Sequence, residues 1–290
     1  SRRGFGLQAI ASSNPVMAMA SVSLVASLGL ACTNAYFTYL AVEPKNLPVD
    51  KRIPAYFVNA EWWCPIVATV GYLCFCYFGK KFMMSRSSGV DEVVMKQAMR
   101  VYNLYQTLFN ILCIVLCLRA HRDQKMLFWG NVTDFGVGGF GMSQFIWLHY
   151  NNKYVELLDT FFMVCRRKFE QLSFLHIYHH TLLIWSWFVV MKIEPGGDAY
   201  FGSIMNTGVH VIMYSYYFLA SCGVQCFWKR YITQVQMLQF VIVASQSVFT
   251  IWKKNVHPVL PWLQLWVMLN MLVLFANFYR KSYSKKKKAT

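Results

Sequence analysis

Residues 174–191 read FLHIYHHTLLIWSWFVVM, an apolar and aromatic run that forms most of a bilayer-crossing helix. Three of the chain's seven histidines, His176, His179 and His180, stand at its start in the spacing H-x-x-H-H. On a helix these positions are i, i+3 and i+4, which predicts that the three imidazoles share one face. Ionisable groups at membrane depth are costly and mark functional sites by default. We therefore interpret this box as the first candidate site.

The composition of the whole chain is that of an integral membrane protein. Its 290 residues are 57% hydrophobic, 17% aromatic and only 14% charged, with a mean hydropathy of +0.35. A soluble domain carries about 25% charged residues, and several apolar runs here reach the roughly 20 residues that cross hydrocarbon. The net charge of +16 does not indicate nucleic acid as a partner, because the basic residues lie between the apolar runs.

Seven apolar segments predict an all-α polytopic fold, because runs of about 20 residues are too long for the strands of a membrane barrel, which need about 10. Basic residues follow the first, third, fifth and seventh segments, so the positive-inside rule places these connections and the C-terminus in the cytosol. Residues 16–41 favour one additional membrane helix over a targeting segment or a surface helix. The seven predicted segments are 60–79, 97–118, 142–164, 170–191, 199–220, 231–252 and 259–279.

Two of these segments carry polar side chains that need partners inside the bundle. The third holds Lys153, Glu156 and Asp159, three ionisable groups on one membrane helix. They predict either an ion pair that fixes helix packing or carboxylates that orient imidazoles. On the fifth segment, a sector of roughly 100° collects polar and aromatic side chains at helical spacing. Its members are Asn206, His210, Met213, Tyr214 and Tyr217.

Amide side chains mark the remaining two polar segments. The sixth contains Thr233, Gln236 and Gln239, which predict the polar mouth of a tunnel or hydrogen bonds between helices. The second offers Asn103, Gln106 and Asn110, for which a packing role and a functional role remain equally open. The nine cysteines indicate neither a disulfide framework nor a zinc site, because no C-x-x-C pair is matched by a second one.

Taken together, these motifs resemble the ELO family of fatty-acid elongases, the membrane 3-oxoacyl-CoA synthases. The resemblance runs from about residue 50 to the C-terminus and covers four motifs in order. They are K-x-x-E-L-x-D-T at Lys153–Thr160, H-x-x-H-H at His176–His180, N-x-x-x-H-x-x-M-Y-x-Y-Y at Asn206–Tyr217 and T-x-x-Q-x-x-Q at Thr233–Gln239.

The resemblance implies a seven-helix fold in which six helices form an inverted barrel around a closed tunnel. It implies the first step of microsomal chain elongation, in which a malonyl-CoA two-carbon unit is joined to an acyl-CoA with release of CO₂. We accordingly divide the chain into an N-terminal segment, 1–54, a catalytic membrane domain, 55–281, and a basic cytosolic tail, 282–290. Lys287 and Lys288 in this tail look like a dilysine retrieval signal for the endoplasmic reticulum.

The residues can be given roles on the same basis. The family resemblance implies that the acyl group passes to His179, with His210 opposite it, and imidazole is a competent covalent acceptor. His176, His180, Glu156 and Asp159 complete the expected catalytic group. The expected substrate-binding residues are Lys153, Asn206, Tyr214, Tyr217, Gln236, Gln239, Arg166, Arg167 and Lys168.

The expected partners are malonyl-CoA, acyl-CoA and the lipid bilayer, with no metal and no further cofactor. The resemblance also raises contacts with the reductase and dehydratase of the elongation cycle, and a homo-oligomer. Saturated or monounsaturated acyl groups of medium or long length are favoured, and polyunsaturated acyl-CoA is the alternative. A di-iron desaturase or hydroxylase needs about eight histidine ligands around open metal positions, and the chain has seven histidines. A non-enzymatic lipid transporter would show Gly- or Pro-broken paired helices.

Overall fold

The computed structural model describes residues 61–284, and every regular element in that range is a helix. Each of the seven predicted segments corresponds to one helix or to helices in direct succession. The possible extra helix at 16–41 and the dilysine pair lie outside the described residues. The elements are α3 (Trp63–Cys74), η1 (Phe75–Gly79), α4 (Lys80–Ser85), α5 (Glu92–Asp123), η2 (Val137–Gly139), α6 (Phe140–Val155), α7 (Leu158–Cys165), α8 (Phe174–Ile193), α9 (Ala199–Ser221), α10 (Lys229–Lys253), α11 (Val259–Tyr279) and η3 (Arg280–Ser284).

Five of these segments are long and apolar enough to cross a membrane by themselves. They are Trp63–Ser85, Glu92–Asp123, Phe174–Ile193, Lys229–Lys253 and Val259–Ser282.

The other two segments are the third and the fifth, which carry the ionisable and polar candidate site residues. The third segment is interrupted at Glu156 and Leu157, so α6 and α7 contain only 16 and 8 residues. The fifth, α9, has 23 residues but carries Asn206, His210 and several tyrosines, which lower its hydropathy. The chain is therefore a polytopic all-α membrane protein whose two most polar segments depend on the bundle around them.

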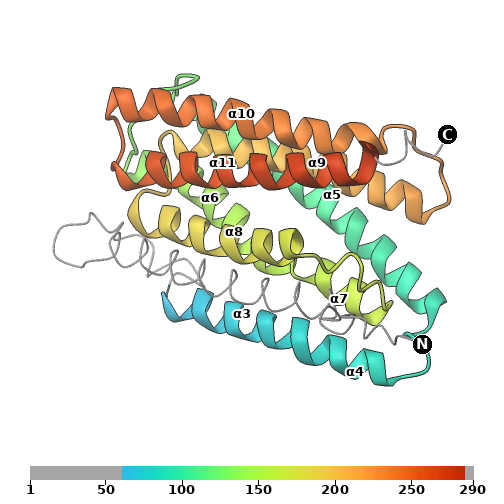
Figure 1. Ribbon diagram of the computed structural model, residues 1–290. Helices are drawn as coiled ribbons and strands as arrows, with labels where there is room; N and C mark the ends of the chain where they lie inside the picture. Colours follow the sequence, from blue (N-terminus) through green and yellow to red (C-terminus); the bar gives the residue numbers. More distant parts are fainter. Residues whose placement is uncertain (1–60, 285–290) are drawn as a thin grey trace, which may run out of the picture.

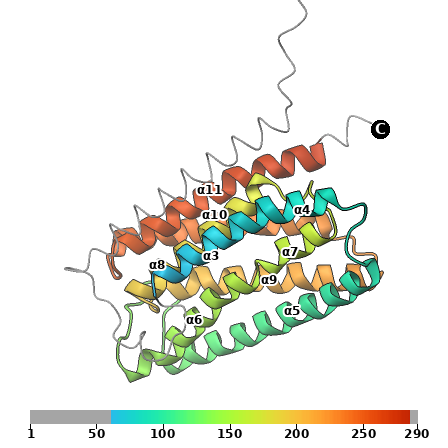
Figure 2. The ribbon, with the colours of Figure 1, turned by 90° about the horizontal axis from the view of Figure 1, so that it is seen from below.

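Six helices close into a ring. Along it, α5 packs on α6, α6 on α8, α8 on α11, α11 on α10, α10 on α9, and α9 again on α5. Helices α3 and α4 lie outside the ring, against α8 and α7 (Figures 1 and 2). This agrees with the six-plus-one arrangement that the family resemblance implied.

Side-chain caps set where two of the helices begin. The Asp91 carboxylate accepts a hydrogen bond from the Val94 backbone N–H (2.9 Å) and starts α5. The Ser173 hydroxyl accepts one from the His176 backbone N–H (3.3 Å) and starts α8. Because Ser173 is the cap, the histidine box occupies the first two turns of α8, at the end of the bundle where α5 and α10 also begin.

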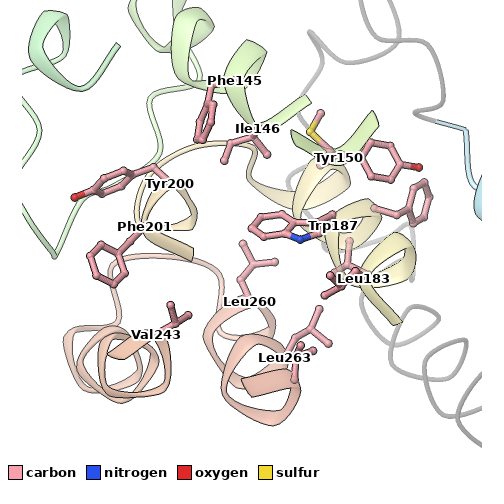
Figure 3. Packing of buried hydrophobic residues seen from close by; sticks show 14 of the residues in the cluster. Phe145, Ile146, Tyr150, Leu183, Trp187, Tyr200, Phe201, Val243, Leu260 and Leu263 are labelled. Atoms are coloured by element: carbon pink, nitrogen blue, oxygen red, sulfur yellow. The ribbon is translucent and has the colours of Figure 1, made fainter. Parts of the chain in front are cut away.

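The interior of the ring is filled largely by apolar and aromatic side chains. Trp187 and Leu183 of α8 lie across from Leu260 and Leu263 of α11, and Val243 of α10 completes this layer (Figure 3). Burying such side chains fully contributes about 1.5–3 kcal/mol each when water is the reference. Within a bilayer the same contacts act through close packing rather than through exclusion of water.

A buried carboxylate closes the opposite end of the bundle. Asp198, at the start of α9, is 2% exposed and accepts hydrogen bonds from the Gly130 N–H (2.9 Å) and the Asn131 N–H (2.8 Å) of the α5–α6 connection. It also accepts hydrogen bonds from the Thr250 hydroxyl at the end of α10 and from the Asn255 amide, both at 3.1 Å. One side chain thus ties three separate parts of the chain together.

Asp198→Ala should lower the apparent melting temperature in detergent strongly, because each buried donor left without a partner costs about 1–3 kcal/mol. Asp123→Ala is the matched control, since the Asp123 side chain is 61% exposed beside Arg122 and surface changes of this kind stay within about 0.5 kcal/mol. Equal melting temperatures for the two variants would show that the Asp198 network does not hold this end of the bundle.

Candidate active site

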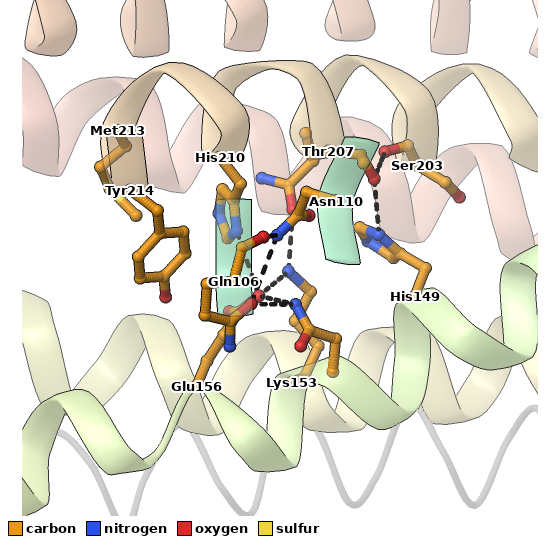
Figure 4. Close-up of polar contacts among 12 residues, drawn as sticks. Gln106, Asn110, His149, Lys153, Glu156, Ser203, Thr207, His210, Met213 and Tyr214 are labelled. Atoms are coloured by element: carbon orange, nitrogen blue, oxygen red, sulfur yellow. Dashed lines mark hydrogen bonds and ion pairs between the residues drawn. The ribbon is translucent and has the colours of Figure 1, made fainter. Parts of the chain in front are cut away.

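A buried ion pair stands at the end of α6. The Lys153 ammonium lies 2.8 Å from Glu156 Oε1, and the two side chains are 2% and 1% exposed. His210 Nδ1 of α9 lies 3.1 Å from the same oxygen. Lys153 also donates to Asn206 Oδ1 (2.9 Å), one helical turn before His210. Figure 4 shows this group between α6 and α9. The structure therefore brings four predicted site residues from two helices into one network.

Three amide side chains complete the network on its other side. They are Asn152 of α6 and Gln106 and Asn110 of α5. Asn152 donates from Nδ2 to Glu156 Oε1 (3.1 Å) and to Gln106 Oε1 (3.0 Å). Asn110 Nδ2 lies 3.3 Å from Gln106 Oε1, and Gln106 is fully buried. The sequence left Gln106 undecided between packing and function, and it did not single out Asn152. The available signal was the i, i+4 spacing of Asn152 and Glu156, which places both on one face of a helix.

The second carboxylate of the motif faces a different partner. Tyr214 donates its hydroxyl to Asp159 Oδ2 at 2.8 Å, and the Tyr102 hydroxyl lies 3.4 Å from that of Tyr214. Tyr217, which was predicted to share this stripe, is 41% exposed and lies beside Tyr214 with ring centroids 6.0 Å apart. Asp159 and Tyr214 are thus joined by a buried hydrogen bond, whereas Tyr217 is exposed.

The three histidines of the box share one side of α8, as predicted, but they contact different neighbours. His176 Nε2 lies 2.7 Å from the Thr160 hydroxyl, which in turn is 2.9 Å from the Tyr72 hydroxyl on α3. His180 is buried with its ring centroid 4.4 Å from that of His176. His179 instead lines the central cavity. The ring centroid of His179 is 5.3 Å from that of His180, so the three imidazoles form one group at the start of α8, as the i, i+3 and i+4 spacing predicts.

The cavity lies between α8, α9, α10 and α11 and contains about 820 Å³ of empty space, including the part that is open to the outside. At one end it is lined by His179, Asn206 and Gln239, and at the other by Asp198 and Thr250. Mostly apolar side chains line it in between, together with Ser186, Gln246 and Gln264. No cysteine is among the described residues of this lining. A long apolar cavity with polar groups at its ends is suited to an amphipathic ligand.

Two predicted residues stand behind this lining. His210 is 4% exposed beside Glu156 and is not among the residues that line the cavity; Asn206, one turn earlier, is. The α6 ion pair holds His210 beside Glu156, and the placement of His210 opposite His179 stays a prediction. Gln236 also lies outside the lining, with Nε2 3.8 Å from Met213 Sδ.

Two of the three basic residues in the α7–α8 connection are hydrogen-bonded within the protein. Arg166 donates to Met99 Sδ (3.3 Å), and Arg167 donates to the Ser87 carbonyl (2.9 Å). Arg167 also adopts a positive φ of 55°, which turns the chain after α7. Lys168 is exposed. Of the three predicted phosphate contacts, Lys168 is therefore the one that presents its charge most openly.

These features define a class of protein: a polytopic helical membrane protein with a buried polar site beside an apolar, histidine-lined cavity. Among residues 61–284, no group of three or more His, Cys, Asp or Glu side chains is arranged to hold a metal ion.

Comparison with known proteins gives the family. The model of the GNS1/SUR4 (ELO) family matches residues 57–290, and the chain belongs to this family. It is 32% identical over 244 residues to very long chain fatty acid elongase 2 of Mus musculus, covering 82% of each chain. It is 33% identical over 246 residues to very long chain fatty acid elongase 5 of Bos taurus and to that of Homo sapiens, covering 82% of this chain and 80% of each relative.

Glu156→Gln should lower the apparent melting temperature in detergent markedly, because removing one member of a buried ion pair costs about 3–5 kcal/mol. The double variant Lys153→Met with Glu156→Leu should recover much of the loss, since no charge then stays buried and unpaired.

The matched control is the exposed pair of Glu92 and Lys96, which has the same 2.8 Å separation but side-chain exposures of 73% and 53%. Glu92→Gln should change the stability by no more than about 1 kcal/mol. A loss for Glu156→Gln as small as this control's would show that the buried pair does not stabilise the bundle.

Proposed function

We propose that this protein catalyses the condensing step of fatty-acid elongation, as the names of its relatives suggest. An acyl-CoA and malonyl-CoA react to give a 3-oxoacyl-CoA, free CoA and CO₂. The observation that carries the proposal is the position of His179. It lines the apolar cavity beside Asn206, which is hydrogen-bonded to the buried Lys153. The His179 imidazole therefore presents a nucleophilic nitrogen to the cavity that would hold the acyl chain. Polar side chains such as Asn206 lie near this nitrogen.

In the first step, a nitrogen of the His179 imidazole attacks the thioester carbon of the acyl-CoA. The carbon–sulfur bond breaks, and the sulfur leaves with a proton as free CoA. The product is an acyl-imidazole on His179, with the acyl chain in the cavity. Histidine can form such covalent intermediates, which divide one difficult reaction into two easier ones.

Asn206 is suited to stabilise the negative charge that develops on the thioester oxygen. Its Oδ1 accepts a hydrogen bond from Lys153 (2.9 Å), which directs its Nδ2 donors elsewhere. Because Asn206 also lines the cavity, we assign these donors to the thioester oxygen. Donors that are already oriented in a dry site stabilise a transition state at little reorganisation cost.

His210 and Glu156 form the proposed acid–base pair. With Nδ1 facing the carboxylate at 3.1 Å, the imidazole is held in one orientation and leaves Nε2 for proton transfer. We assign to it the proton that the departing CoA sulfur takes up, in a general acid–base role. Asp159, held by Tyr214, acts as a positioning group on the same side of the site.

In the second step, malonyl-CoA loses CO₂, and the electron pair of the broken carbon–carbon bond gives an enolate. The enolate carbon attacks the acyl carbon on His179, and the carbon–nitrogen bond to the imidazole breaks. The departing imidazole nitrogen takes up one proton from solvent, which we assign to transfer through His210, and the histidine returns to its starting form. We assign the phosphates of both CoA substrates to Lys168 and its basic neighbours at this end of the bundle. Saturated or monounsaturated acyl groups remain the proposed substrates, and the endoplasmic reticulum remains the proposed location.

His179→Ala should abolish condensation while the protein stays folded, because the acyl acceptor is lost. Intact mass spectrometry after incubation with acyl-CoA alone should show an acyl adduct on the parent protein and none on the variant. His121→Ala, at the other end of the bundle where His121 Nε2 lies 3.2 Å from the Leu127 carbonyl, is the control and should retain the adduct.

Two results would count against this assignment. Appreciable turnover by the His179→Ala variant would remove His179 as the nucleophile. A parent protein that condenses without any detectable adduct would favour direct reaction in a ternary complex, with the histidines as acid–base groups only.

His210→Ala should reduce turnover by about 10²-fold or more, which is the scale of losing a general acid–base group. Acyl-CoA binding should change less than turnover, because His210 stands behind the cavity lining and its proposed role is in proton transfer. Steady-state kinetics and equilibrium binding separate the two effects. Near-normal turnover would instead place His210 among the residues that only hold α6 and α9 together.

A further inference from the structure

A single glutamine side chain crosses the cavity part of the way along its length. Gln264 of α11 donates from Nε2 to Gln246 Oε1 (2.6 Å) and to the Ser247 hydroxyl (2.9 Å), both on α10. Gln264 and Gln246 both line the cavity. Gln246 is 1% exposed, and its own amide nitrogen donates to the Thr250 hydroxyl (3.0 Å). The Gln264 amide is therefore held in place by partners that are themselves fixed.

A glycine on the third wall leaves room for this amide. At Gly202 of α9, an added Cβ would lie 2.7 Å from Gln264 Oε1 and 3.7 Å from Val243 Cγ1. The Gln264 side chain thus extends from α11, along α10, to the backbone of α9. Any side chain at position 202 would have to displace the amide.

The depth of the crossing follows from helix geometry. Leu260 and Met271 line the cavity near its two ends, and the Phe275 ring lies 6.2 Å from the His179 ring. At 1.5 Å per residue, Gln264 stands about 6 Å above Leu260 and about 10 Å or more below the level of His179. An extended alkyl chain advances about 1.25 Å per carbon, as bonds of about 1.5 Å at angles near 111° dictate. The space beyond Gln264 thus corresponds to about four or five carbons.

We infer that Gln264 is the stop against which the methyl end of the acyl chain rests, and that it sets the longest chain the enzyme elongates. This inference rests on the proposed function, because it takes the cavity to be the acyl-chain site. A longer chain has to push the amide aside and break its hydrogen bonds to Gln246 and Ser247. It would leave those polar groups without partners against an apolar chain, which is unfavourable.

The test uses the full-length protein in detergent and a series of saturated acyl-CoAs that differ by two carbons. Two quantities are measured for each length: the rise in melting temperature on binding, and the rate of condensation with malonyl-CoA. Gln264→Ala should move the longest accepted chain upward by about four carbons, the length that fits beyond the stop. Gly202→Ala should move the preference to shorter chains, and adding Gln264→Ala in the same molecule should relieve that effect.

Asn270→Ala is the control, because Asn270 is a second amide on α11 that is absent from the lining and donates to the Trp266 carbonyl of its own helix (2.8 Å). Its length profile should match that of the parent protein.

The outcomes separate the inference from the proposed function. If the parent condenses and the Gln264 and Gly202 variants keep its length profile, Gln264 is not the stop. If neither the parent nor any variant condenses but the length profile of thermal stabilisation shifts as expected, the stop stands and the proposed chemistry fails. If the parent neither condenses nor is stabilised by an acyl-CoA of any length, both are overturned.

Discussion

The arrangement of the site depends on the buried pair of Lys153 and Glu156. Two full charges inside a membrane protein are tolerated only when they are paired and hydrogen-bonded, since desolvation costs each ion several kcal/mol. A single oxygen atom, Glu156 Oε1, lies within 3.1 Å of the Lys153 ammonium, the Asn152 amide and His210 Nδ1. These partners come from α6 and α9, and Gln106 of α5 holds the Asn152 amide. Satisfying one carboxylate therefore fixes the relative positions of three helices.

The break between α6 and α7 allows the second carboxylate to serve a different purpose. At the break, the Leu157 N–H donates to the Tyr154 carbonyl (3.2 Å) and the Asp159 N–H to the Glu156 carbonyl (3.1 Å), which are i to i−3 bonds. This tighter turn changes the direction in which the following side chains point. Glu156 faces the ion network, whereas Asp159 accepts the Tyr214 hydroxyl. In an unbroken helix, two carboxylates three residues apart would lie side by side and repel each other.

The cavity gives this polar site its proposed substrate class. Its lining is mostly apolar, with the Gln264 amide part of the way along, and its two ends carry different polar groups. His179 and Asn206 stand at the proposed reacting end, whereas the fully hydrogen-bonded carboxylate of Asp198 connects the loops at the far end. Asp198 already accepts hydrogen bonds from several donors. Its carboxylate therefore stabilises the contacts between helices and loops at this end and has little remaining capacity to accept hydrogen bonds from a ligand. Under the proposed function, the length of this largely apolar cavity is the property that distinguishes acyl chains.

The sequence by itself determined the seven helical segments, the membrane environment, and the motifs on α6, α8 and α9, because length, hydropathy and helical spacing are local properties. It also indicated that Lys153, Glu156 and His210 needed buried partners. Only the tertiary structure decided which partners they found. It turned His179 into the cavity and His176 toward Thr160, and it placed the Gln264 amide in the cavity opposite Gly202. Such choices depend on which helices pack together and at what rotation, which the spacing of residues along one helix does not specify.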